Sequence, residues 1–182
     1  MSQSSLRTRL RFGLGALAVI VAILAIAAIS ALDRLGSAIA TILRENYLSV
    51  VMCERMQEAL ERQDSAALFA ANGQRATADK LRIENKAAFA AAFERETRNV
   101  TIPGEGELVA RLGREYADYS RAVERVLGLG EKEQAKEYFA DLLPRFQSMK
   151  RLVQDIGAMN HAHMEQADRQ AKQLAHDTVR LA

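Results

Sequence analysis

The sequence predicts an all-α protein in which an N-terminal transmembrane helix is continuous with an antiparallel four-helix bundle. Three observations predict this fold. An apolar run near the N-terminus carries no charged side chain, and Ala, Leu, Glu, Arg and Gln dominate the rest of the chain. Alternating runs of Val, Ile, Thr and aromatic residues, which indicate strands, do not occur. Apolar residues recur instead at spacings of three and four, the period of a helix face.

The apolar run covers residues 12–32. A helix of about 20 apolar residues is long enough to cross the hydrocarbon core of a bilayer. Because positive charge remains on the cytoplasmic side, we expect residues 1–11 inside the cell and residues 33–182 outside it. The alternative is a cleaved signal peptide, whose apolar region of roughly 7–15 residues is shorter. Three arginines precede the run: Arg7, Arg9 and Arg11.

Residues 33–182 have the length of a single domain. The chain has 25 basic and 23 acidic residues, and three of the basic ones precede the apolar run, so the outer part is near neutral. A nucleic-acid-binding protein would show a basic surplus, and we expect no such partner. The single cysteine, Cys53, excludes an internal disulfide. His161 and His163 lie two residues apart, on different faces of a helix, and we expect no metal site.

The first predicted helix covers residues 12–71, so that the membrane span passes directly into the bundle. Positions from 35 to 70 repeat at spacings of four and three without a break, which is a heptad seam. Gly73 follows the helix, where glycine is favoured. The residues of this seam are Leu35, Ile39, Ile42, Asn46, Ser49, Cys53, Met56, Leu60, Gln63, Ala67 and Ala70.

The second predicted helix covers residues 76–98, and a loop of residues 99–107 with one proline and two glycines follows it. The third covers residues 107–127. The expected inner face of the second helix is Ile83, Ala87, Ala90 and Phe93, with Phe89 beside them. The expected inner face of the third is Val109, Leu112, Tyr116, Tyr119, Val123 and Val126.

The last helical part begins with residues 131–143, after which Pro144 either kinks the helix or starts a new one. Residues 33–71 and 144–182 would then form two helices of equal length, about 58 Å each. With two shorter helices between them, they predict the antiparallel bundle. The expected inner face of the last helix is Phe146, Met149, Val153, Ile156, Asn160, His163, Ala167, Gln170 and Leu174.

A weak candidate ligand or signalling site is a set of polar residues on the seams of the first and last helices. Helical rise places Cys53 and His163 at similar distances from the ends of their helices, so we expect one polar layer. Its structural interpretation is a layer that fixes helix register; its functional one is a packing switch. Leucine at Asn160 and His163 should then stabilise the bundle or leave it unchanged. The residues of this set are Asn46, Ser49, Cys53, Asn160 and His163.

A second candidate is an anion pocket made by arginines, which recognise carboxylate and phosphate in a forked geometry. The alternative is a solvated face, because acidic residues alternate with the basic ones. No catalytic motif or phosphate loop occurs, so we expect no catalytic residue and no cofactor in this stretch. The pocket would be lined foremost by Arg44 and Arg55, and the other basic residues considered are Arg62, Arg75, Lys80 and Arg82.

Three segments resemble the sensor region of KinB-type bacterial histidine kinases, which control alginate biosynthesis. They are ILRENYLSVVMCERMQEALERQDSAALFA at residues 42–70, NVTIPGEGELVARLGREYADY at residues 99–119, and YFADLLPRFQ at residues 138–147. The resemblance implies a membrane helix and a periplasmic four-helix sensor, followed in the longer protein by a second span, a linker and kinase domains. It supplies no ligand residue.

We therefore expect an extracytoplasmic sensing module, anchored in the bacterial inner membrane, that passes a stimulus by helix displacement. A small molecule or anion is a candidate ligand. The alternatives are the ligand-binding part of a chemoreceptor and a single-pass helical scaffold or adaptor. We also expect a homodimer along the first helix, since the resemblance implies paired kinase halves. Oxidation of Cys53 should cross-link that dimer if the cysteine lies near the dimer axis.

Overall fold

The structure is a computed structural model that describes residues 3–180, without the side chains of residues 3–9, 131, 175 and 177–180. It is all-α, as the sequence predicts, and the described residues contain no strand. The chain forms two units, Met1–Thr41 and Ile42–Ala182. The helices are α1 (Gln3–Ala71), α2 (Arg75–Thr97), α3 (Glu105–Leu127), α4 (Glu131–Glu137), the π-helical turn η1 (Tyr138–Leu142) and α5 (Leu143–Arg180).

The first unit belongs to helix α1. From residue 10 to residue 38 every described side chain is exposed, including the large apolar ones. Exposed apolar surface on this scale is unfavourable in water and favourable in lipid. Within the described part of the chain, α1 is the one helix that is long and apolar enough to cross a membrane.

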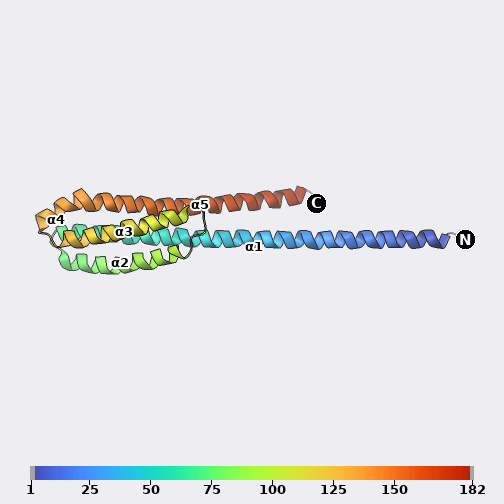
Figure 1. Ribbon diagram of the computed structural model, residues 1–182, viewed down its shortest axis with the longest axis horizontal. Helices are drawn as coiled ribbons and strands as arrows, with labels where there is room; N and C mark the ends of the chain where they lie inside the picture. The colour runs from blue at the N-terminus through green and yellow to red at the C-terminus, as the bar shows by residue number, and fades with distance from the viewer. Residues whose placement is uncertain (1–2, 181–182) are drawn as a thin grey trace. The chain divides into compact units, whose positions relative to one another are not determined.

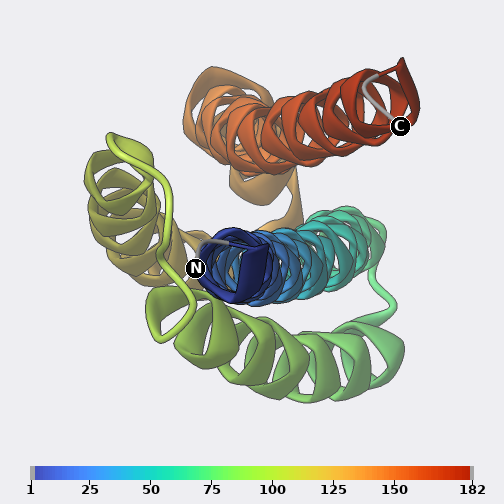
Figure 2. The same ribbon diagram turned by 90° about the vertical axis from the view of Figure 1, so that its right-hand side faces the viewer.

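The second unit is a set of helices that run in alternating directions, as the successive colours of Figure 1 show. Figure 2 shows α2, α3 and α5 on different sides of the cyan part of α1. Buried side chains of α1, α2, α3, η1 and α5 form one core cluster. Gln63 of α1 donates to the Asn85 carbonyl of α2 and accepts from Tyr116 of α3. Lys150 of α5 pairs with Glu61 of α1 at 2.7 Å.

The inner faces expected for α1 and α3 are confirmed within this unit. The α1 seam is buried from Asn46 to Ala70, and the α3 seam from Val109 to Val126 is buried or half-buried. The face expected for α2 is wrong at Ile83, Ala87 and Ala90, which are exposed; Phe93 packs against the core, and Phe89 is fully buried. The true inner face consists mainly of small or polar residues, so its apolar period is weak. Its buried residues are Ala78, Phe89, Ala92 and Glu96.

The helix passes through Pro144 by means of a π-helical turn. Pro144 is the second residue of α5, and the five residues before Leu143 form η1. The Leu143 N–H donates to the Tyr138 carbonyl, five residues earlier, which is π-helical spacing. A proline lacks an N–H and crowds the preceding turn of a regular α-helix. Pro144 therefore lies in the first turn of α5, directly after a wider helical turn that the sequence did not indicate.

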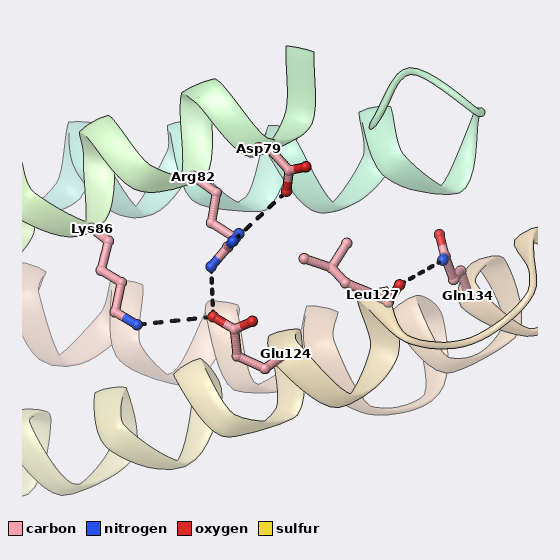
Figure 3. Close-up of polar contacts among 6 residues, drawn as sticks. All are labelled: Asp79, Arg82, Lys86, Glu124, Leu127 and Gln134. Carbon is pink, nitrogen blue, oxygen red and sulfur yellow. Dashed lines mark hydrogen bonds and ion pairs between the residues drawn. The ribbon is translucent and has the colours of Figure 1, made fainter. Parts of the chain in front are cut away.

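Polar contacts fasten α2 to α3 and close the C-terminal end of α3 (Figure 3). Arg82 of α2 lies 2.5 Å from Glu124 of α3, and Lys86 lies 3.9 Å from the same carboxylate. The buried Gln134 side chain donates to the carbonyls of Leu127 and Leu129 at 3.2 and 2.7 Å. The last carbonyls of a helix lack intrahelical donors, so Gln134 supplies donors at the end of α3.

Candidate functional site

A cluster of polar residues, all of them buried or half-buried except the exposed Thr101, interrupts the apolar core of the second unit. Four segments contribute to it: α1, the end of α2 with its following loop, the start of α3, and α5. Buried polar groups of this kind are costly unless their hydrogen bonds are satisfied. This cluster, here called the polar layer, consists of Asn46, Ser49, Glu96, Asn99, Thr101, Glu105, Asn160 and His163.

Within the polar layer, α1 and α5 meet through Asn46 and His163. The Asn46 Nδ2 amide donates to His163 Nδ1 at 2.7 Å, and Asn46 Oδ1 accepts from the Thr101 hydroxyl at 3.3 Å. An imidazole nitrogen that accepts a hydrogen bond carries no proton, so the proton of the neutral ring lies on Nε2. His163 Nδ1 is therefore the acceptor in the contact between α1 and α5.

Glu105 is a fully buried carboxylate that accepts hydrogen bonds from three N–H donors and lies at the N-terminal end of the α3 dipole. Its Oε2 accepts from the backbone N–H groups of Thr101 and Ile102, at 2.8 and 3.1 Å. Its Oε1 accepts from Asn160 Nδ2, which also donates to the Ile156 carbonyl of α5. Glu105 is also the first residue of α3, where the helix dipole favours negative charge. One side chain thus holds the α2–α3 loop, α3 and α5 together.

Glu96 of α2 is also fully buried, but its environment is the opposite of that of Glu105. Neither of its carboxylate oxygens has a hydrogen-bond partner among the described residues. Burial raises the pKa of Glu96 to about 7; the nearby Ser49 hydroxyl opposes this rise, and the charge of Glu105 adds to it. Ser49 itself accepts from Asn99 Nδ2 at 2.9 Å. Glu96 is therefore a buried acid that changes charge near neutral pH.

Cys53 lies inside the bundle beside the polar layer. It is 5 % exposed, and a Cβ added at Gly157 of α5 would lie 3.5 Å from the Cys53 Cβ. This position corrects the expectation that Cys53 serves as a cross-linking probe of the dimer axis, because the thiol faces α5 of its own chain. Burial, together with the charges of Glu96 and Glu105, raises the pKa of the Cys53 thiol.

Cys53 should resist modification by a maleimide in the folded protein and react fully in denaturant. The reason is that the thiolate is the reactive form, and both burial and the raised pKa suppress it. Mass spectrometry after timed labelling at pH 7 measures the difference. A Leu48→Cys variant, with Cys53 replaced by alanine, provides a more exposed thiol on the same helix as the control. Equal labelling rates at positions 48 and 53 would contradict the buried position.

The two arginines expected to line an anion pocket do share one cavity. Arg44 and Arg55 of α1, with Arg95 of α2, line a cavity of about 450 Å³. The other basic residues considered do not join it. Arg62 pairs with Glu58, Arg82 pairs with Glu124, and Arg75 donates to the Leu129 carbonyl at the other end of α2; Lys80 is exposed on α2.

All five residues expected in the polar set lie in or beside the polar layer, but half of the layer was missed. Glu96 was missed because the inner face of α2 was assigned from Ile83. A face assigned from Phe89 continues through Ala92 to Glu96 at spacings of three and four. Asn99, Thr101 and Glu105 were assigned to a loop. Their signal was the acidic residue at a helix start just after Pro-Gly.

No group of three His, Cys, Asp or Glu residues converges within the part of the chain that the structure describes. His161 is exposed, whereas His163 faces α1.

Comparison of the chain with protein-family models, with curated proteins and with solved structures gave no match.

Proposed function

We propose that this chain is the extracytoplasmic input module of a membrane-bound sensor histidine kinase. The observation that carries the proposal is the hydrogen bond between Asn46 of α1 and His163 of α5, in a bundle whose core is otherwise mostly apolar. Helix α1 also holds the segment that is apolar enough to cross a membrane. The resemblance to KinB-type sensors supports the kinase class. In this proposal residues 1–11 are cytoplasmic, and the bundle lies in the periplasm of a bacterium, outside the inner membrane.

The Asn46–His163 contact suits a device that distinguishes two arrangements of the first and last helices. Packed helices shift by about 1–2 Å in known signalling transitions. A shift of that size breaks a hydrogen bond of 2.7 Å, because such bonds weaken steeply with distance and angle. The layer therefore favours one register of α1 against α5, and a stimulus that favours another register would pass as a helix displacement.

In a sensor of this kind, kinase domains elsewhere in a longer protein carry out the catalytic step, and residues 1–182 carry out no catalysis. Paired kinase halves must meet in order to phosphorylate each other. We therefore propose a homodimer that forms along α1, with the exposed side chains of that helix at the interface. Because Cys53 is buried against α5, the dimer should be detected by sedimentation of the membrane-anchored chain rather than by Cys53 oxidation.

The test is a chimera that joins residues 1–182 to the second span and kinase domains of a histidine kinase with measurable autophosphorylation. Replacing His163 with leucine removes the acceptor of Asn46. We expect autophosphorylation of the chimera to change by about fivefold or more, the lower range of allosteric coupling.

The control is Gln170→Leu, on an exposed position of the same helix, which should leave autophosphorylation unchanged. A folded, membrane-inserted chimera whose output is the same in the wild type and in His163→Leu would refute the sensor mechanism. A change of equal size in the control variant would also argue against it, because the effect would then not depend on the polar layer.

A further inference from the structure

We infer that a groove between α1 and α2 binds a small organic dianion, with carboxylate or phosphate groups on an apolar frame. This inference rests on the proposed sensor function, since it names the class of ligand that such a sensor would detect. The groove is the cavity of about 450 Å³ lined by Arg44, Arg55 and Arg95. A neighbouring cavity of about 390 Å³ along the same two helices shares Arg55 and Arg95.

The three arginines of the groove differ from most arginines of this bundle in having no acidic partner. Across the described residues, no ion pair or hydrogen bond is formed by the guanidinium groups of these three. Many other arginines of the bundle pair with acidic neighbours one helical turn away or across helices. Arginines with such acidic partners include Arg62, Arg82, Arg98, Arg111, Arg121, Arg125, Arg145 and Arg169.

The charge of the groove is positive and its floor is apolar. Three arginines face one carboxylate, that of Glu45, around the cavity. Guanidinium groups bind carboxylate and phosphate through paired, charge-assisted hydrogen bonds. The remaining lining is mostly apolar or aromatic, which suits the frame of an organic ligand better than a bare inorganic ion. These apolar and aromatic residues are Tyr47, Leu48, Val51 and Met52.

The spacing of the arginines favours a ligand with two acidic groups. Arg44 and Arg55 lie eleven residues apart on α1, so they share a face and are separated by about 16 Å along the axis. Arg95 lines both cavities together with Arg55. One acidic group between Arg55 and Arg95, and a second reached by Arg44, would place the frame over the apolar floor.

The groove also touches the polar layer. Asn99 lines the cavity, and its Nδ2 donates to the Glu45 carbonyl and to the Ser49 hydroxyl, at 2.8 and 2.9 Å. A ligand that moves Asn99 therefore changes a hydrogen bond to Ser49, which lies next to Glu96. Occupancy of the groove can alter the layer that joins α1 to α5 through this one side chain.

The test is isothermal titration of the full chain, in nanodiscs of zwitterionic phosphatidylcholine, with terephthalate, an aromatic ring that carries two carboxylates. We expect saturable binding that weakens as salt is added, because charge pairing contributes to it. Arg55→Gln should weaken binding at least tenfold, the loss expected for hydrogen bonds to a charged group. Arg44→Gln and Arg95→Gln should weaken it in the same direction.

Three controls separate the groove from general charge attraction. Arg151→Gln removes an exposed arginine of α5 that lines neither cavity and should leave binding unchanged. The neutral analogue 1,4-benzenedimethanol should not bind, and inorganic phosphate should bind more weakly than terephthalate. Absence of terephthalate binding, or equal binding by Arg55→Gln and Arg151→Gln, would overturn the inference.

Two measurements, terephthalate binding and the output of the kinase chimera, distinguish a wrong ligand groove from a wrong sensor function. If terephthalate does not bind but His163→Leu changes the output of the kinase chimera, the groove is wrong and the sensor stands. If terephthalate binds through the three arginines but neither it nor His163→Leu changes that output, the groove is a binding site and the sensor function is wrong.

Discussion

Replacing Asn160 with leucine should lower the free energy of unfolding by about 3 kcal/mol. The reason is that Asn160 Nδ2 is the side-chain donor to the buried carboxylate of Glu105. In the variant Glu105 Oε1 loses this donor, while Oε2 keeps the N–H groups of Thr101 and Ile102. Leaving one oxygen of a buried charged group unsatisfied costs the upper part of the usual range of about 1–3 kcal/mol. This prediction differs from the expectation from sequence, in which leucine at Asn160 and His163 stabilises the bundle or leaves it unchanged. Chemical denaturation followed by circular dichroism measures it.

The matched control is Gln170→Leu, which also places leucine on the seam of α5 but at an exposed position. Its unfolding free energy should stay within about 0.5 kcal/mol of the wild type. Unchanged stability in Asn160→Leu would mean that its amide does not support Glu105 in solution.

Replacing Glu96 with glutamine should remove a pH dependence of stability. Burial raises the pKa of Glu96 from 4.5 to about 7. A carboxyl whose folded pKa is raised stabilises the fold below its unfolded pKa, and this contribution is lost as pH rises through the folded value. In the wild type, stability should therefore fall between about pH 4.5 and pH 7, by at most about 3 kcal/mol from this group.

Glutamine has nearly the same shape and stays neutral. Glu96→Gln should therefore match the wild type near pH 4.5 and exceed its stability at pH 8. Glu94→Gln, at an exposed position of the same helix, should follow the wild type at both pH values. Urea denaturation of all three proteins at the two pH values measures the difference. A constant gap between Glu96→Gln and the wild type at both pH values would show that Glu96 does not titrate in this range.

The helices could be predicted from the sequence because the residues that indicate them are close together in the chain and regularly spaced. Glycine follows α1, and the seams of α1 and α3 have large apolar residues at regular spacing. The inner face of α2 could not be assigned correctly, because Ile83 is more apolar than the alanines that the helix buries. The π-helical turn before Pro144 depends on the geometry of the preceding turn, which the proline alone does not specify.

The candidate site was predicted only where it lies on a heptad seam. Asn46, Ser49, Asn160 and His163 interrupt regular seams, so polar residues at those positions stand out. Asn99 reaches the layer from a loop, and Glu105 reaches it from the start of α3. Hydrophobic periodicity carries no information about such segments. Arg95 could not be predicted to line the cavity with Arg44 and Arg55, because its place there depends on how α2 packs against α1.

The most direct test of the account is whether α1 and α5 shift along each other when their polar contact is broken. Spin labels at Glu54→Cys and Glu165→Cys, with Cys53 replaced by alanine, lie at exposed positions on the two helices and at different heights. Pulsed electron paramagnetic resonance of the chimera in nanodiscs then measures the distance between them, with and without His163→Leu. The account predicts that the mean distance changes by about 1–2 Å in the variant that changes kinase output, and that it stays unchanged in Gln170→Leu. Distance distributions that superimpose while kinase output differs would contradict it.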